Sequence, residues 1–412
     1  MIITTAAFAQ LSIVPISRTA EPSIHARKAN LSAQALPFWD DFSFNTNSGL
    51  PNDTLWENGA RVFVNDGLGI NPPSIRVATF DGLDSLGSPY NVTDVLAKGF
   101  ADRLISRKIN LEAVPADQRS TVYLSFYYQI KGLGEMPDTD DNFSLWLKNS
   151  NGTWENVFTA AYNTELDPKV FNYVTVPVSD DRFFHAEFQF KFENFARLSG
   201  PYDMWHLDYV YLNSGRVAGE RSMPDRTISM NLTSIFDGYH AIPISHYRDT
   251  ADELTVIPTI KLFGLLENNF QPFRYTTTAD VKTLKAETIE AKRILIEDDA
   301  APVNPVSGNT EIILPFQILN LTLQKQFPND SIDLTADSVS IKMNFGLNTG
   351  DDNPLIYLPS YEPINFLRND STNRTFTLSS YYAKDDGVAE FGAGLNQSGA
   401  CLLYTSPSPR DA

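Results

Sequence analysis

Cysteine is almost absent from this chain of 412 residues, because Cys401 is the only one. A single cysteine cannot form a disulfide within the chain and cannot supply the paired thiolates of a zinc site. Cys401 also lies in a C-terminal segment that we exclude below, so we expect no cysteine nucleophile. The lack of disulfides does not argue against secretion, since large domains bury enough apolar surface to fold without them.

Positive charge and long apolar runs are also scarce. Lys and Arg number 32 against 50 Asp and Glu, which gives a formal net charge of −18. A polyanion without a basic cluster repels phosphate backbones, so nucleic acid is excluded as a partner. No stretch approaches the roughly 18 consecutive apolar residues of a membrane-spanning helix. We therefore expect no transmembrane segment.

The sequence contains no recognisable catalytic motif. There is no Gly-x-Ser-x-Gly elbow, His-Glu-x-x-His, phosphate-binding loop or dinucleotide fingerprint. The five histidines are scattered, at His25, His185, His206, His240 and His246. Carboxylate pairs with the spacing of a glycosidase site arise by chance among 50 acidic residues. We therefore predict a non-enzymatic protein without catalytic residues.

Apolar residues, which make up 42% of the chain, recur mainly with a period of two. Phe188, Phe190 and Phe192 alternate with polar residues, which is typical of a half-buried strand in an antiparallel sheet. Similar faces are formed by Val122, Leu124, Phe126, Tyr128 and Ile130, by Phe143, Leu145 and Leu147, and by Ile341, Met343 and Phe345. Turn clusters separate them, so we predict an all-β fold built from sandwiches. Only 280–293 also fits a short helix, although its Thr and Ile residues favour a strand.

Four segments between residues 37 and 213 carry a family resemblance. They read Pro37-Phe38-Trp39-Asp40-Asp41-Phe42, Pro72-Pro73-Ser74-Ile75-Arg76-Val77-Ala78-Thr79-Phe80-Asp81-Gly82-Leu83-Asp84, Val122-Tyr123-Leu124-Ser125-Phe126-Tyr127-Tyr128-Gln129 and Gly200-Pro201-Tyr202-Asp203-Met204-Trp205-His206-Leu207-Asp208-Tyr209-Val210-Tyr211-Leu212-Asn213. Together they resemble the N-terminal jelly-roll module, similar to MAM and laminin-G domains, of surface proteins that Bacteroidetes export by type IX secretion. The resemblance implies a secreted or outer-surface location and the type IX secretion machinery as a partner during export.

These patterns predict seven regions. They are a signal-peptide remnant at 1–9, a lead-in at 10–36, the MAM-like jelly-roll sandwich at 37–213, a linker at 214–222, an Ig-like or fibronectin-like sandwich at 223–378, the truncated start of a further jelly-roll module at 379–400 and an artefact at 401–412. Ala7 and Ala9 are the small residues that precede a signal-peptidase cut. Residues 401–412 resemble translated sequencing-adapter read-through from a metagenomic assembly, so the natural chain is expected to continue past Ala400.

The acidic residues of the jelly-roll block suggest a structural Ca²⁺, which takes six to eight oxygen ligands. Candidate ligands fall in three spots: Asp40 and Asp41, then Asp138, Asp140 and Asp141, and finally Asp203 and Asp208. Because the first and last strands of a sandwich pair, we expect the first and third spots to lie close together. The resemblance to MAM-like modules supports an ion near the start of the module. The alternative is that these are solvated loop acids of a very acidic protein.

Aromatic side chains on polar strand faces form the candidate ligand-binding site. Trp146 shares the polar phase of its strand with Ser144 and Lys148, and Tyr123 and Tyr127 share that of a neighbouring strand. An exposed aromatic platform of this kind stacks against pyranose rings. The alternative is that a loop or the second domain covers the face, since aromatic residues usually lie in the core.

From these features we expect a secreted or cell-surface protein of adhesion or recognition, with a glycan or another surface polymer as ligand. Two alternatives stay open. The chain can be the non-catalytic accessory region of an exported hydrolase whose catalytic domain lies beyond residue 400. It can also be a structural spacer of the secretion or gliding apparatus.

Overall fold

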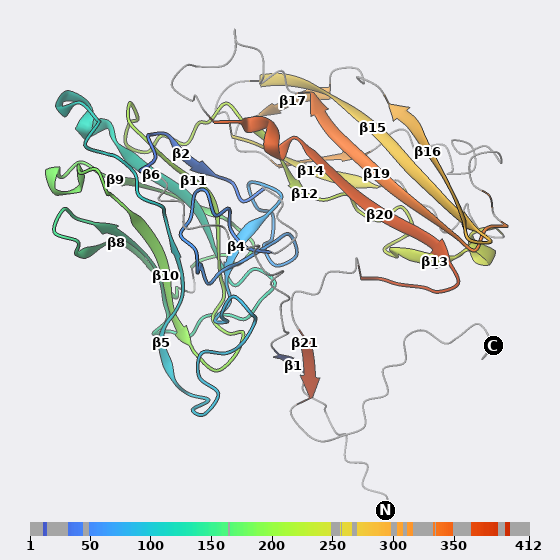
Figure 1. Cartoon of the computed structure of the whole chain (residues 1–412), viewed down its shortest axis with the longest axis horizontal. Coiled ribbons are helices and arrows are strands. Elements are labelled where there is room, and N and C mark those ends of the chain that lie inside the picture. The colour runs from blue at the N-terminus through green and yellow to red at the C-terminus, as the bar shows by residue number, and fades with distance from the viewer. Residues whose placement is uncertain are drawn as a thin grey trace, which may run out of the picture.

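The structure, a computed structural model, has mostly β-strands as its regular elements, and they form two sandwiches connected by loops and short helices (Figure 1). It describes residues 11–14, 32–43, 49–163, 165–248, 256, 258–265, 270–297, 303–307, 311–315, 333, 335–348, 364–385 and 392–395. The predicted signal-peptide remnant, most of the predicted lead-in and the segment 401–412 lie outside these residues. The predicted all-β fold class is confirmed.

The first sandwich consists of two antiparallel sheets. The four-stranded sheet has the order β5 (Lys98–Ile105), β10 (Phe190–Arg197), β7 (Asn142–Lys148) and β8 (Trp154–Ala161). The six-stranded sheet has the order β3 (Phe63–Asn65), β4 (Val77–Phe80), β11 (Trp205–Asn213), β6 (Tyr123–Ile130) and β9 (Asn172–Pro177), with β2 (Phe38–Asp40) beside β11. Two short 3₁₀ helices, η1 (Ala116–Thr121) and η2 (Asp181–Phe183), lie in the connections.

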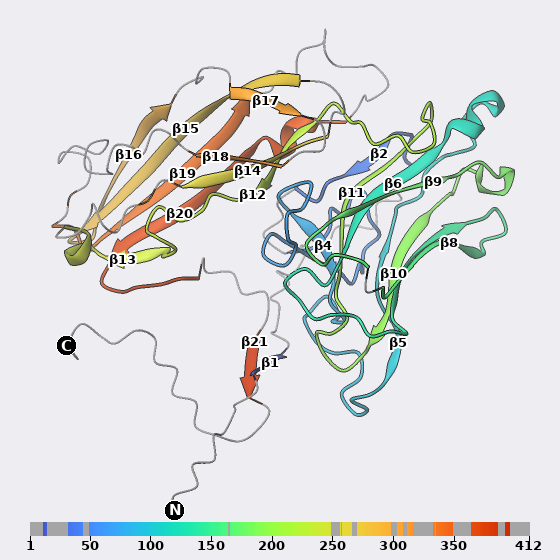
Figure 2. The same ribbon diagram turned by 180° about the vertical axis from the view of Figure 1, so that it is seen from behind.

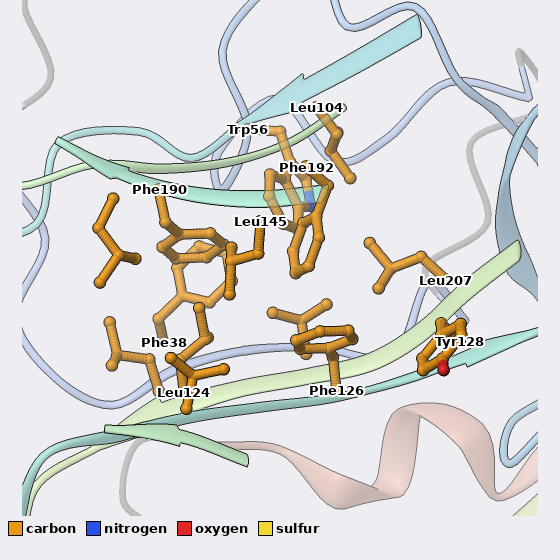
Figure 3. Close-up of a cluster of buried hydrophobic side chains, with 14 of the residues drawn as sticks. Phe38, Trp56, Leu104, Leu124, Phe126, Tyr128, Leu145, Phe190, Phe192 and Leu207 are labelled. Carbon is orange, nitrogen blue, oxygen red and sulfur yellow. The ribbon is translucent and has the colours of Figure 1, made fainter. Parts of the chain in front are cut away.

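The core of this sandwich follows from the alternation in the sequence. Phe190 and Phe192 of β10 are fully buried, as is Phe126 of β6 in the facing sheet. Figure 3 shows the rings of Phe126 and Phe192 meeting between the sheets, edge to face with 4.9 Å between centroids. Burying a phenylalanine contributes about 1.5–3 kcal/mol, so this aromatic cluster is a main source of stability.

The second sandwich also has two sheets. One has the order β12 (Arg226–Met230), β14 (Thr259–Gly264) and β18 (Glu311–Pro315). The other has the order β13 (Ala241–Pro243), β20 (Ser371–Ser379), β19 (Ser338–Asn348), β15 (Phe270–Lys285) and β16 (Thr288–Glu297), with β17 (Val303–Ser307) beside β15. Residues 280–293 form a hairpin of β15 and β16 and not a helix, with positive φ at Ala286 and Glu287 in the turn.

The two sandwiches share a third buried cluster. Trp39 and Tyr209 of the six-stranded sheet pack against Phe366 in the 3₁₀ helix η5 (Phe366–Asn369) of the second sandwich, and Trp39 lies 5.5 Å from Phe366 between ring centroids. The outer face of the six-stranded sheet is therefore covered. The four-stranded sheet lies on the side of the first sandwich away from the second (Figures 1 and 2).

A two-stranded ribbon joins segments from the two ends of the described chain. Strand β1 (Leu11–Val14) pairs with β21 (Gly392–Leu395), so the predicted lead-in meets the predicted start of a further module. That predicted module start also contacts the second sandwich, because Ala383 bridges Ala241. Among the described residues, no helix is long and apolar enough to cross a membrane.

Candidate functional site

Three aspartates converge in the loops before β7 and β11. Asp138, Asp141 and Asp203 each offer one carboxylate oxygen, and these oxygens lie within 4.8 Å of one another. Asp141 and Asp203 are buried, whereas the Asp138 side chain is 45% exposed. The Asp138 amide donates to Asp141 Oδ2 at 2.8 Å and to Asp203 Oδ1 at 3.3 Å. This triad can hold a metal ion such as Ca²⁺, because all of its groups are oxygen ligands.

Two basic side chains compensate the charge of this triad. Lys98 Nζ lies 3.1 Å from Asp138 Oδ2, 3.0 Å from Asp141 Oδ1 and 2.5 Å from Asp140 Oδ1. Arg197 Nη2 lies 3.0 Å from Asp138 Oδ2. Burial raises the pKa of Asp141 to about 6, whereas the hydrogen bond from Lys98 lowers the pKa of Asp138. A metal ion at the triad therefore competes with the Lys98 ammonium group.

The two aspartates of the third predicted spot, Asp203 and Asp208, lie apart, one near each of the other two spots. Strands β2 and β11 pair, and Ser74 Oγ donates to Asp208 Oδ1 at 3.0 Å and to the Asp41 carbonyl oxygen at 2.5 Å. Asp208 thus lies near Asp41, whereas Asp203 belongs to the triad. Among the described residues, Asp40, Asp41 and Asp208 do not form a second group with such closely spaced oxygens.

A buried polar cluster that the sequence did not reveal connects the two sandwiches. Asn369 Nδ2 donates to Asp41 Oδ2 at 2.8 Å and to Asp225 Oδ2 at 2.9 Å. Tyr209 Oη also donates to Asp225 Oδ2, at 2.6 Å. No local motif marks Asp225 or Asn369, because their proximity to Asp41 depends on how the sandwiches pack.

The outer face of the four-stranded sheet carries a group of aromatic side chains. Phe100, Trp146, Trp154 and Phe195 come from its four strands, and we call this group the aromatic face. The Phe100 ring lies 6.4 Å from Trp146 and 5.6 Å from Phe195, and Phe100 is 56% exposed. Lys191 Nζ lies 5.1 Å from the Trp146 ring and 5.5 Å from the Trp154 ring. The lysine thus holds the two indoles on one surface through cation–π contacts.

The three predicted ligand-binding residues do not share a surface. Trp146 lies on the aromatic face, but Tyr127 is only 5% exposed, with its ring 4.9 Å from Tyr173 and 6.3 Å from Phe263 of the second sandwich. Tyr123 is half-buried at the start of β6, in the other sheet. Tyr127 is therefore closed to a ligand here, because the second sandwich covers its side of the sheet.

Sequence reasoning missed three of the four residues of the aromatic face. Phe195 keeps the outward phase of Glu193 in β10, but two residues of β10 pair with three of β5 between Glu193–Arg103 and Phe195–Phe100, so the alternation of β5 is broken before Phe100. A bulge of this kind moves a residue to the opposite face. Trp154 is paired with Lys148 in register, and Phe100 with Phe195. Only the pairing of strands, which the sequence does not specify, brings these rings together with Trp146.

Comparison with known proteins assigns no sequence family. No protein-family model matches the chain, and no curated protein matches it. The chain is a distant structural match to carbohydrate-binding β-sandwich modules. One is the tandem CBM22-1–CBM22-2 domain of Xyn10C from Paenibacillus barcinonensis, with 8% identity and a TM-score of 0.27, covering 86% of this chain and 98% of that one.

Two single modules match a smaller part of the chain. The CBM22-1 xylan-binding domain of the same Paenibacillus barcinonensis protein shows 12% identity and a TM-score of 0.26, covering 46% of this chain and 100% of its own. The xylan-binding module CBM15 shows 15% identity and a TM-score of 0.23, covering 39% of this chain and 94% of its own. These values are too low to transfer a ligand or a binding residue.

Proposed function

We propose that this chain is a non-enzymatic glycan-binding protein and that the aromatic face is its contact surface. The observation that carries the proposal is the grouping of Phe100, Trp146, Trp154 and Phe195 on one sheet face, with Phe100 more than half exposed. Aromatic rings offer large, rigid apolar surfaces, against which the apolar face of a pyranose ring packs. Binding of this kind fits the exported setting that the family resemblance implies.

Polar groups beside the rings supply the hydrogen bonds that a sugar requires. Asn156 and Thr159 of β8 are exposed and lie in register with Trp146 and Ser144, respectively. A surface that combines flat apolar rings with amide and hydroxyl groups binds a ligand that has both apolar faces and a polar rim. Pyranose rings have this character, which favours a glycan over a purely apolar ligand.

The test is affinity gel electrophoresis of the whole chain against a panel of soluble polysaccharides. We predict retardation by at least one of them and a loss of affinity of about tenfold or more for Trp146→Ala, since buried contact tryptophans often contribute over 1–2 kcal/mol. Tyr381→Ala is the matched control, because Tyr381 is 53% exposed and lies outside the aromatic face. Retention of full affinity by W146A, or no binding to any polysaccharide, would refute the proposal.

We also propose that Asp138, Asp141 and Asp203 take Ca²⁺ as a structural ion. Two observations support the proposal: the oxygens of the triad lie close together, and the Lys98 ammonium group contacts two of its three carboxylates. The ion would supply that charge and tie the loop before β7 to the loop before β11. An ion that binds only the folded chain raises the melting temperature.

Calorimetry of the metal-stripped protein, with and without millimolar Ca²⁺, tests this assignment. We predict that Ca²⁺ raises the melting temperature by about 2–4 °C for each kcal/mol of binding energy. Asp203→Asn should abolish the shift, whereas Lys98→Gln should enlarge it because the competing ammonium group is gone. Asp117→Asn, at an exposed position in η1, is the control. A wild-type protein that does not respond to Ca²⁺ contradicts the assignment.

A further inference from the structure

Two cations on or beside the aromatic face form no ion pair among the described residues. Lys148 Nζ donates to the neutral Gln189 Oε1 at 3.0 Å and lies 5.7 Å from the centroid of the Trp154 ring. Arg103 is exposed on β5, opposite Glu193 in register. Glu193 is engaged elsewhere, since its Oε2 lies 2.7 Å from Lys191 Nζ.

The carboxylates around these cations already have partners. Glu155 lies 3.1 Å from Arg182 and accepts from Asn149, and Glu187 lies 2.6 Å from Lys108. Glu57 accepts from the neutral Gln189 Nε2 at 2.7 Å and forms no ion pair among the described residues. In a chain with 50 acidic and 32 basic residues, a surface where two cations stand against one anion without an ion pair is unexpected. The net charge of these three groups is therefore positive.

A small cavity adjoins one edge of the same face. It measures about 70 Å³ and is lined by Arg103, Ile105 and residues 57–60, so Glu57 lines it together with Arg103. Ile105 pairs in register with Lys191, so the cavity opens beside the edge strand of the aromatic face. A side group on a glycan chain stacked over Trp146 can enter here and reach the Arg103 guanidinium.

We infer that the ligand of the aromatic face is an acidic glycan, a polysaccharide with uronic acid residues whose carboxylates pair with Lys148 and Arg103. This inference rests on the proposed glycan-binding function. A planar guanidinium group matches the two oxygens of a carboxylate. From strand spacing and rise per residue, the two cations lie on the order of 15 Å apart, so a ligand of several sugar rings is needed to reach both.

The test compares each acidic polysaccharide with its own carboxyl-reduced form. Affinity gels of the whole chain with polygalacturonate, alginate and glucuronoxylan, before and after reduction, should show about tenfold tighter binding of at least one acidic form. This preference should shrink at high salt, which screens exposed charges. Lys148→Gln and Arg103→Gln should each weaken binding of the acidic form about fivefold more than binding of the reduced form. Lys282→Gln, at an exposed position of β15, is the control.

Each outcome separates the inference from the function on which it rests. Equal binding of the acidic and reduced forms, with both lost in Trp146→Ala, overturns the carboxylate assignment and keeps the glycan-binding function. Acidic binding that survives Trp146→Ala, or that ignores both cation substitutions, places the ligand elsewhere and overturns the inference. If no form of any polysaccharide binds, the inference and the proposed function fail together.

Discussion

At the scale of single residues, Asp40 shows how burial changes the chemistry of a side chain. It is 3% exposed, and its carboxylate accepts from Trp56 Nε1 at 2.5 Å and from the Phe42 amide at 3.0 Å. Burial raises its pKa from 3.8 to about 7, against the lowering effect of the Trp56 hydrogen bond. The folded chain therefore holds a proton on Asp40 between about pH 4 and 7 that the unfolded chain has lost.

This difference in protonation predicts how stability depends on pH. Because the native state binds more protons, the contribution of Asp40 is fully present below pH 4 and is lost as the pH rises through 7. The rise in the Asp40 pKa corresponds to a decrease of about 4 kcal/mol in the free energy of unfolding between about pH 4 and pH 7. We predict that Asp40→Asn removes this loss, so the stability of the variant relative to wild type rises with pH.

Urea denaturation of both proteins at pH 5 and pH 7.5 measures the effect. The buried His206, whose pKa burial lowers to about 4, changes stability in the opposite direction. It is present in both proteins, so its contribution cancels in the comparison. A stability difference between wild type and variant that is the same at both pH values contradicts the account.

At the scale of elements, the end of η5 connects strands from both sandwiches. Asn369 closes η5, while Asp41 follows β2 and Asp225 precedes β12, and the three side chains meet through the Asn369 amide group. Each of the two buried carboxylates takes one of its hydrogen bonds from this amide group, and a hydrogen bond to a charged group contributes about 1.5–3 kcal/mol.

We predict that Asn369→Ala lowers the free energy of unfolding by about 2–4 kcal/mol, because two hydrogen bonds to buried carboxylates are lost. Calorimetry measures the loss. Asn373→Ala is the control, because Asn373 is exposed on β20 and its substitution should change stability by less than about 0.5 kcal/mol. Equal stability of the two variants would show that the Asn369 contacts do not hold the sandwiches together.

The sequence predicts which residues of a strand share a face, but it does not predict what packs against that face. Phe143, Leu145 and Leu147 are all fully buried, as their alternation predicts. Alternation also places Tyr127 on the opposite face of its strand, but it does not say what lies against that face. Tyr127 is buried by the second sandwich, while Trp146 lies beside the exposed Phe100. The difference arises from domain packing, which no local pattern encodes.

The sequence also does not fully predict which acidic residues the fold brings together. The pairing of the first and last strands was predictable, and it brings Asp41 near Asp208. Asp203 lies five residues before Asp208, which in an extended strand is a distance of about 16 Å. It therefore joins Asp138 and Asp141 at a different place. The sequence prediction placed Asp203 and Asp208 in one of its three acidic spots, whereas the structure places them in two separate groups.

At the scale of the whole molecule, the two sheets of the first sandwich have different outer surroundings. The six-stranded sheet contributes Trp39, Tyr127 and Tyr209 to the contact with the second sandwich. The four-stranded sheet lies on the far side and carries the aromatic face (Figures 1 and 2). The second sandwich thus packs against one sheet and leaves uncovered the opposite sheet, on which we propose that the glycan binds.

The structure of the chain with an oligosaccharide cut from a polysaccharide that it binds is the most direct test of this account. The account predicts sugar rings packed against Trp146 and Phe100 on the β5–β10–β7–β8 sheet, with at least one carboxylate at Lys148 or Arg103. An oligosaccharide bound to the second sandwich or to another surface, with the aromatic face empty, would contradict it.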